Sequence, residues 1–367
     1  MIDQRAQRLA QVLVRHSTAV QPGDLVAIEG DSAAESLILA VFEETLRAGG
    51  QPMLSVTPRG AESALFEHAS DEQLDFVSPV TELLTDRSDV RIRVRAQENT
   101  RELSQVDPAR QVRVQRSREP VMERMMERSA KGELRWVLCQ YPTNGYAAEA
   151  EMSLSDYEQF LYSACLCDRE DAVGAWRSAA GETERLTEWI GGREEVHIQG
   201  PGTDLKLAIA QRTFVACGGL RNMPDGEFFT GPVEDSAEGE ITFHFPTVFG
   251  GREVAGVKLR FQGGAVVDAR AERGEALLHQ MLDTDAGSRR LGELGIGTNF
   301  QITHGTRSIL FDEKIGGTVH LALGRSYPET GGVNVSALHW DLICDLRRGG
   351  TVTVDGEVLQ RDGAFVV

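Results

Sequence analysis

The chain has 367 residues, 41% of them hydrophobic, which is long enough for two packed domains. Its formal net charge of −18 argues against nucleic acid and anionic membranes as partners, because both require a basic surface. No stretch approaches the roughly 20 apolar residues of a membrane span, and residues 1–8 contain no apolar signal core. The five cysteines fit neither a zinc ribbon nor a secreted disulfide framework. We therefore expect a cytoplasmic protein.

Helical and strand-like segments alternate in the first half of the chain. Residues 4–15 carry apolar side chains at helical spacing, and residues 24–29 form a short apolar run typical of a buried strand. A helix capped by Asp31 or Ser32 should follow to about residue 47, before a second strand at residues 51–56. This order is typical of a parallel sheet, and it predicts an N-terminal parallel α/β domain over residues 1–191.

Two features of this half could suggest an anion site. The turn at residues 30–34 lacks both the dinucleotide-binding and the Walker pattern, so we expect only a helix cap there. Residues 90–95 alternate strictly and place Arg91, Arg93 and Arg95 on one face of a strand. Because the chain has 56 acidic residues, we expect this face to be solvated or salt-bridged.

Further helices are expected before the domain boundary. Residues 108–130 are charged and mostly helical, and residues 136–142 then form another core strand that ends at a proline. Ser155 and Glu158 have the spacing of a capping box at the start of the next helix. Cys165 and Cys167 on that helix are interpreted as buried structural cysteines.

The hydrophobic period changes from helical to two after about residue 191. Strand-like segments lie at residues 195–199, 204–209, 239–245, 257–261, 317–323 and 351–354, and one helix is expected at residues 272–282. We therefore predict a β-rich, barrel-like C-terminal catalytic domain over residues 192–367. The whole fold is an α/β domain followed by an α+β domain.

Side chains able to bind a divalent cation gather in this second half. Glu293 is flanked by glycines and apolar residues, where an unpaired carboxylate would cost several kcal/mol. His339 and Asp341 are two residues apart, so in a strand they would face the same ion. His320 lies in an apolar run, where a lone histidine is more often a satisfied core residue than a ligand. Two imidazoles and several carboxylates suit Zn²⁺, Co²⁺ or Mn²⁺.

Other candidates are less specific. Glu227 follows a Pro-Asp-Gly turn, and Tyr327 could polarise a carbonyl or simply pack. His244, His304 and Asp312 are reserve candidates, for which ordinary structural roles are preferred. The sequence contains no His-Glu-x-x-His, Gly-x-Ser-x-Gly or P-loop motif, so zincin, α/β-hydrolase and NTPase functions lack their usual support.

Four ordered segments resemble the sequence blocks of the M29 metallo-aminopeptidases. They are residues 222–232, 292–299, 320–328 and 336–341, and residues 141–143 and 152–158 resemble the N-terminal half of that family. The resemblance covers most of the chain. The segment between Tyr327 and His339 is shorter than in the founding members, which leaves substrate preference open.

The resemblance implies a catalytic centre with two divalent metal ions, Zn, Co, Mn or Mg. Its ligands would be Glu227, Glu293, His320, His339 and Asp341, with Glu293 as the bridge. Tyr327 would lie close to the metals and help to hold the oxyanion, and Glu227 or Asp312 would carry the proton. The resemblance further implies a homodimer that removes N-terminal residues from peptides with a free N-terminus.

Two other functions remain possible interpretations of the same residues. M29-like sequences include ring-cleaving dioxygenases of 2,5-dihydroxypyridine type, in which one Fe(II) is held by two histidines and one carboxylate. His320, His339 and Asp341 would supply that set, but Glu227 and Glu293 would then be unnecessary. A metal-stabilised binding protein without turnover is the second alternative, and it would leave no open coordination position.

Overall fold

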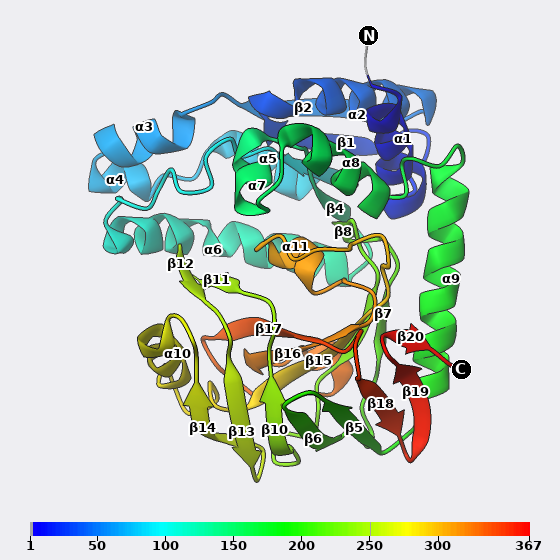
Figure 1. Cartoon of the computed structure of the whole chain (residues 1–367). Coiled ribbons are helices and arrows are strands. Elements are labelled where there is room, and N and C mark those ends of the chain that lie inside the picture. The colour runs from blue at the N-terminus through cyan, green and yellow to red at the C-terminus, as the bar shows by residue number, and fades with distance from the viewer. Residues whose placement is uncertain (1–2, 250) are drawn as a thin grey trace. The chain divides into compact units, whose positions relative to one another are not determined.

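The computed structural model describes residues 3–249 and 251–367 (Figure 1). The chain divides into two compact units. The N-terminal unit comprises residues 1–176 and 219–223, and the C-terminal unit comprises residues 177–218 and 224–367. The division falls within helix α9 (Ala172–Ile190). The boundary expected after residue 191 stays a prediction.

A five-stranded parallel sheet forms the centre of the N-terminal unit, in the order β2-β1-β3-β4-β8. Its strands are β1 (Leu25–Asp31), β2 (Gln51–Thr57), β3 (Val90–Arg95), β4 (Arg135–Gln140) and β8 (Asn222–Met223). The helices of this unit are α1 (Gln4–Val12), α2 (Glu35–Arg47), α3 (Ala61–His68), α4 (Asp71–Leu74), α5 (Pro79–Arg87), α6 (Pro108–Ala130), α7 (Asn144–Glu149) and α8 (Leu154–Ala164). The expected parallel sheet is confirmed.

Two helix starts differ from the expectation. A short 3-10 turn, Ser32–Ala34, precedes α2, and Asp31 makes no side-chain capping bond. The Asp31 carboxylate instead accepts a hydrogen bond from the Ala96 backbone N–H at 2.8 Å, because the end of β3 lies beside it. The capping box at Ser155 was wrong, since Ser153 caps α8 by accepting from the Asp156 N–H. Local spacing cannot show which of two nearby serines precedes the first turn.

The C-terminal unit contains two large sheets with antiparallel pairing. The larger has the order β14-β13-β10-β6-β5-β18-β19-β20, and the smaller has the order β17-β16-β15-β9-β7. The larger comprises β5 (Glu195–Gly200), β6 (Thr203–Ala208), β10 (Glu238–Thr242), β13 (Lys258–Gln262), β14 (Ala265–Arg270), β18 (Thr351–Val354), β19 (Glu357–Arg361) and β20 (Ala364–Phe365). The smaller comprises β7 (Val215–Cys217), β9 (Glu227–Thr230), β15 (Leu291–Gly297), β16 (Thr318–Gly324) and β17 (His339–Asp345).

Both large sheets contribute to one apolar core. Ile198 and Leu207 of the larger sheet and Leu294 and Leu321 of the smaller are members of a single buried cluster. A two-stranded ribbon, β11 (Thr247–Phe249) with β12 (Arg252–Val254), and helices α10 (Glu275–Leu282) and α11 (Ile309–Asp312) complete the unit. The mixed α/β class with parallel and antiparallel sheets is confirmed, whereas barrel-like closure stays a prediction. Among the described residues, no helix combines the length and apolarity needed to cross a membrane.

Candidate metal centre

One face of the smaller sheet collects the ligand candidates. Gly297 pairs with Glu227, and Gly295 pairs with His320 on the next strand. Glu293 lies opposite Ala322, which in turn lies opposite Asp341, and Gly324 lies opposite His339. Because paired residues and residues two apart share a face, the five candidates all point to the same side of the sheet.

Small residues between the candidates leave room for their side chains. A Cβ atom at position 295 would lie 2.0 Å from the His320 ring, so only glycine lets the imidazole lie across the neighbouring strand. A register shift between Leu291 and Glu293 marks a bulge at the start of β15. Bulges next to active sites commonly redirect a side chain.

Glu293 lies between the two imidazoles. One of its oxygens, Oε1, is 3.2 Å from His320 Nε2, and the other, Oε2, is 3.4 Å from His339 Nε2. Glu227 Oε2 approaches His320 Nε2 at 3.4 Å, and Asp341 Oδ2 approaches His339 Nε2 at 3.7 Å. The five side chains therefore converge as two adjoining groups that share Glu293, although their role as ligands stays a prediction.

Backbone contacts define the tautomer of one imidazole. His339 Nδ1 lies 2.9 Å from the carbonyl oxygen of Arg325, and a carbonyl can only accept. Nδ1 therefore carries a proton, and Nε2, which faces the carboxylates, is the nitrogen that could bind a metal once its own proton is lost. A histidine that ligates a metal usually donates its other N–H in this way.

Two charged residues at the centre were missed in the sequence. Lys314 is fully buried, and its Nζ donates to Glu227 Oε1 at 2.9 Å and to Glu313 Oε1 over a short contact. Glu313, His320 and Asp341 each offer a ligand atom within 4.8 Å of the others. The only signal was the charged run 312–314 between apolar residues, and the lysine lies two residues after the end of α11 rather than in a strand.

The carboxylates set the protonation of the histidines. Burial alone would lower the pKa of His320, but its hydrogen bond to Glu293 and the charge of Glu227 raise it to about 10. The pKa of His339 is likewise raised to about 9 against burial, by Glu293 and then Asp341. Burial favours a raised pKa for Glu293, yet the two imidazoles lower it to about 2. Burial and the charge of Glu293 raise the pKa of Asp341 to about 6.

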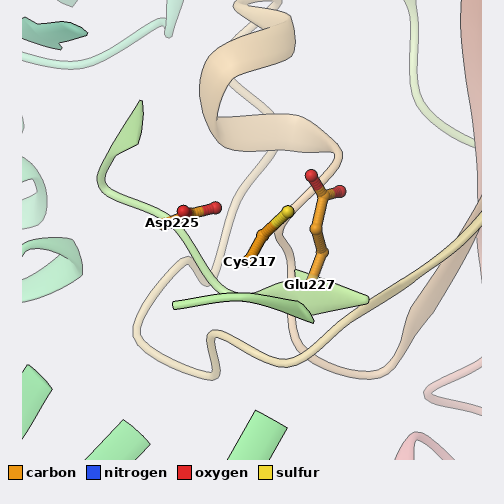
Figure 2. A group of neighbouring side chains, drawn as sticks. All are labelled: Cys217, Asp225 and Glu227. Atoms are coloured by element: carbon orange, nitrogen blue, oxygen red, sulfur yellow. The ribbon is translucent and has the colours of Figure 1, made fainter. Parts of the chain in front are cut away.

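A third group adjoins Glu227. Cys217 pairs with Glu227 across β7 and β9, and Asp225 lies just before β9, so that the three ligand atoms fall within 4.8 Å of one another (Figure 2). Burial and then the charges of Asp225 and Glu227 raise the pKa of the Cys217 thiol well above its usual value. Because a thiol must ionise to bind a metal well, this group is a poor ligand set.

Of the other candidates, only Tyr327 lies at the centre. Its ring packs edge-on against His339 at 5.1 Å and tilts against Phe229 at 5.4 Å. Asp312 instead accepts hydrogen bonds from the backbone and side chain of Thr306. His244 Nδ1 accepts from the Asp345 N–H, and His304 Nδ1 contacts the Thr303 hydroxyl.

Unsatisfied buried atoms show that the residues present fit a cation. Glu227 Oε2 and Asp341 Oδ1 are buried and have no hydrogen-bond partner among the described residues. An unpaired buried carboxylate oxygen costs free energy unless a hydrogen bond or a cation compensates. Carboxylate and imidazole donors in this number suit Zn²⁺, Co²⁺ or Mn²⁺.

Metal uptake at this centre should release protons. Both imidazoles have pKa values of about 9 to 10, so in the metal-free protein they are protonated at pH 8. Since a ligand must give up its proton, we expect about two protons released per chain when metal is added at pH 8. The measurement is calorimetry in two buffers of different ionisation enthalpy. Equal heats of binding in the two buffers would mean that no protons are released, which would contradict this electrostatic explanation.

The same pKa values determine how the stability of the metal-free protein changes with pH. Both folded-state values lie above the usual 6.5 of histidine. The ion pairs therefore stabilise the metal-free protein fully below about pH 6.5, and that contribution is lost as the pH rises through 9 to 10.

The family model described as thermophilic metalloprotease (M29) matches residues 2–365. Aminopeptidase T of Thermus thermophilus is 30% identical over 213 residues, which is 53% of this chain and 52% of that protein, so the chain matches about half of its length.

Two solved structures share the fold. AmpT from Thermus thermophilus superposes with a TM-score of 0.86 at 23% identity, and the match covers 100% of both chains. The 2,5-dihydroxypyridine dioxygenase from Pseudomonas putida KT2440 superposes with a TM-score of 0.60 at 13% identity over 100% of this chain and 99% of that one. Because the family model matches nearly the whole chain, this protein belongs to the thermophilic metalloprotease (M29) family.

Proposed function

We propose that this protein is a metal-dependent aminopeptidase that hydrolyses the N-terminal peptide bond at a centre of two divalent cations. One observation carries the proposal. The two oxygens of Glu293 face different imidazoles, and each imidazole has a further carboxylate beside it. This arrangement supplies two sets of donors with one shared carboxylate, as a dinuclear centre requires. The name of the relative, aminopeptidase T, supports the activity.

The charges at the centre favour two cations over one. Asp225, Glu227, Glu293, Glu313 and Asp341 supply five carboxylates, and Lys314 neutralises one of them. With neutral imidazoles, four negative charges remain. One divalent cation would leave two negative charges, whereas two cations leave none. Because an uncompensated buried charge costs several kcal/mol, the second state is favoured.

Divalent cations at such a centre activate water and polarise the scissile carbonyl. The residues of the chain would hold and orient the ligands and hold the transferred proton. Glu293 would hold the two donor sets together, and the Arg325 carbonyl would orient His339 through its Nδ1–H. Burial raises the pKa of Glu227, which supports a role in holding the transferred proton. Asp312 is a poorer choice, because Thr306 already donates two hydrogen bonds to one of its oxygens.

The carboxylate oxygens at the centre also offer hydrogen-bond acceptors to a substrate with a free amino terminus. A substrate amine would meet acceptors such as Asp341 and Glu313 at the centre. The test compares leucine p-nitroanilide with its N-acetyl derivative. We expect cleavage of the first only, and this cleavage should disappear with a chelator. Equal cleavage of both compounds would mean that the free amine is not recognised and that the protein is not an aminopeptidase.

Tyr327→Phe should reduce turnover without removing metal. The ring contacts with His339 and Phe229 remain, while the hydroxyl that would hold the oxyanion is lost. Loss of one such donor typically costs about 10²-fold or more in kcat. Steady-state kinetics with metal analysis on the same sample would check this. Unchanged kcat would leave Tyr327 with a packing role only.

The dioxygenase is the second candidate, and one observation favours it. The fold superposes on a 2,5-dihydroxypyridine dioxygenase with a TM-score of 0.60. One Fe(II) on His320, His339 and Asp341 would complete that function. It would also leave buried Glu227 and Glu293 and half-buried Glu313 without a second metal ion. Oxygen uptake with a dihydroxylated pyridine, and no peptide cleavage, would support this candidate.

The remaining expectations stay part of the proposal. They are a homodimer, a cytoplasmic location, barrel-like closure of the C-terminal unit, and Zn, Co, Mn or Mg as the metal. A binding protein without turnover would hold metal yet cleave neither anilide.

A further inference from the structure

The sheet of the N-terminal unit has an unusually polar face. Parallel sheets are normally apolar on both faces. In β3, Val90, Ile92 and Val94 are buried on one face, whereas Arg91, Arg93 and Arg95 occupy the other. The register places Glu29 beside Arg93, and Ser55 beside Glu29. A sheet face with charged side chains on two adjacent strands, β1 and β3, is more polar than packing alone requires.

Two hollows adjoin this face. One, of about 330 Å³, lies between the strands and helices α5 and α6, and Arg91, Arg93 and Arg118 are among its lining residues. The other, of about 570 Å³, lies at the carboxyl ends of β1, β2 and β3, where Asp31, Thr57 and Arg95 are the last strand residues. Arg93 lines both hollows.

The larger hollow lies where the chain reverses its direction across the sheet. The order β2-β1-β3 means that the connection after β1 runs to one side and the connection after β2 runs back to the other. In open α/β sheets, ligands bind outside the carboxyl ends of the strands at such a point. The position is therefore one at which this architecture favours a binding site.

The arginines differ in their partners. Arg91 forms an ion pair with Glu29. Arg93 and Arg95 make no ion pair with any carboxylate of residues 3–249 or 251–367, and they stand two residues apart on one face. Partial burial and the like charge of Arg93 lower the pKa of Arg95, whereas Tyr146 and Asp31 act to raise it. Both arginine side chains are exposed and line the larger hollow, so an anionic group of a ligand could accept charge-assisted hydrogen bonds from the two guanidinium groups.

Two helices also begin at the larger hollow. Ser32 and Ala33, at the 3-10 turn that leads into α2, and Gly60 and Ala61, at the start of α3, are among its lining residues. Neither α2 nor α3 has a side-chain cap at its first turn. The Glu35 and Ala61 N–H groups already donate to the Ser32 and Pro58 carbonyls, so any donors to an anion would be other N–H groups of these first turns. They would add hydrogen bonds to the charge of the arginines.

The hollow is not uniformly basic, and this restricts the ligand. Arg59, Arg93 and Arg95 line it together with four carboxylates, Asp31, Glu62, Glu98 and Glu102. Arg59 pairs with Glu98, and Asp31 accepts from the Ala96 N–H. A polyanion such as a nucleotide triphosphate would be repelled by these carboxylates. A ligand with one carboxylate and one ammonium group would meet a partner at each end.

We propose that this hollow binds a zwitterionic amino acid or short peptide, with its carboxylate held by Arg93 and Arg95. The ammonium group would face the acidic part of the lining, of which Glu62 is an exposed member. The cavity of about 570 Å³ has room for more than one residue. The site lies entirely within the N-terminal unit and uses none of the residues of the metal centre.

Calorimetry with leucylglycine tests the proposal. Two forms of the full chain are titrated. The first carries Glu293→Gln, which disables binding at the metal centre, and the second is the unsubstituted chain without metal. We expect one saturable site. Arg93→Gln or Arg95→Gln should each weaken binding about tenfold or more. Arg87→Gln changes an exposed arginine at the end of α5, outside both hollows, and should leave the affinity unchanged.

Two modified dipeptides test whether each charged end of the peptide contributes to binding. N-acetyl-leucylglycine and leucylglycinamide should each bind about tenfold more weakly or worse. The amide, which lacks the carboxylate, should bind Arg95→Gln as well as it binds the parent chain. Thermal unfolding of every variant shows whether it is folded.

Three results would overturn the proposal. The first is no saturable binding of leucylglycine to a folded chain. The second is binding that Arg93→Gln and Arg95→Gln do not weaken, which would place the peptide elsewhere. The third is binding of inorganic phosphate, lost in both arginine variants, without binding of the dipeptide, which would make the site one for phosphate.

Discussion

Glu293→Gln should lower kcat/KM by about 10³-fold or more and reduce the bound metal. Glutamine keeps the size of the side chain but removes the charge that both imidazoles face at 3.2 and 3.4 Å. Its amide can offer only one good donor oxygen, so it cannot serve two donor sets at once. Metal content by elemental analysis and cleavage of leucine p-nitroanilide would be measured on the same preparation.

The matched control is Glu240→Gln. Glu240 is exposed on β10 in the same unit and is far in sequence from the centre. It should keep full metal and activity. If Glu293→Gln kept two equivalents of metal per chain and normal kcat, Glu293 could not be the shared ligand, and the dinuclear arrangement would have to be abandoned.

Lys314→Met should destabilise the metal-free protein by roughly 3–5 kcal/mol. The ammonium group is fully buried and donates to both Glu227 and Glu313. Methionine fills similar space but leaves two carboxylates without their cation, and the pKa values of both are already raised by burial. Chemical unfolding of the chelated protein measures the loss. Activity should fall as well, because these carboxylates would take up protons in place of metal.

A double variant separates charge from packing. Adding Glu313→Gln to Lys314→Met removes one of the uncompensated carboxylates, so it should recover part of the lost stability. Lys258→Met, at an exposed position on β13, should change stability little. If the double variant were less stable than Lys314→Met alone, the lysine would be stabilising the centre through packing, and the ion-pair explanation would be wrong.

The sequence could predict which side chains share a face wherever a strand was evident. His339 and Asp341 are two residues apart, and their side chains approach to 3.7 Å because both lie in β17. Convergence with Glu227 and Glu293 required three further strands in the correct register. The alternation of side chains along a strand does not determine how neighbouring strands align. The five candidates could therefore be grouped only through the resemblance of whole sequence blocks.

Lys314 and Glu313 could not be placed in the same way. They follow the short helix α11 in an irregular segment, where no periodicity relates sequence spacing to direction. A lysine is also rarely fully buried, so composition gave no reason to expect one at the centre. Only the three-dimensional path shows that Lys314 lies against Glu227, 87 positions earlier.

The parallel sheet is confirmed, and so is the solvated or salt-bridged character of its arginine face, because Arg91 pairs with Glu29 while Arg93 and Arg95 are exposed. Strict alternation in residues 90–95 predicted one charged face of a strand, and β3 confirms the alternation. Whether such a face is solvated or lines a hollow depends on the order of the strands. That order, with β1 between β2 and β3, is set by tertiary packing.

The most direct test of the central claim is a metal titration of the chelated protein, with Zn²⁺, Co²⁺ or Mn²⁺ added in steps and the cleavage of leucine p-nitroanilide measured at each step. We predict that bound metal saturates at two equivalents per chain and that full activity needs the second. Saturation at one equivalent, with no cleavage at any ratio and oxygen uptake when Fe(II) and a dihydroxylated pyridine are supplied, would contradict it and favour the mononuclear dioxygenase.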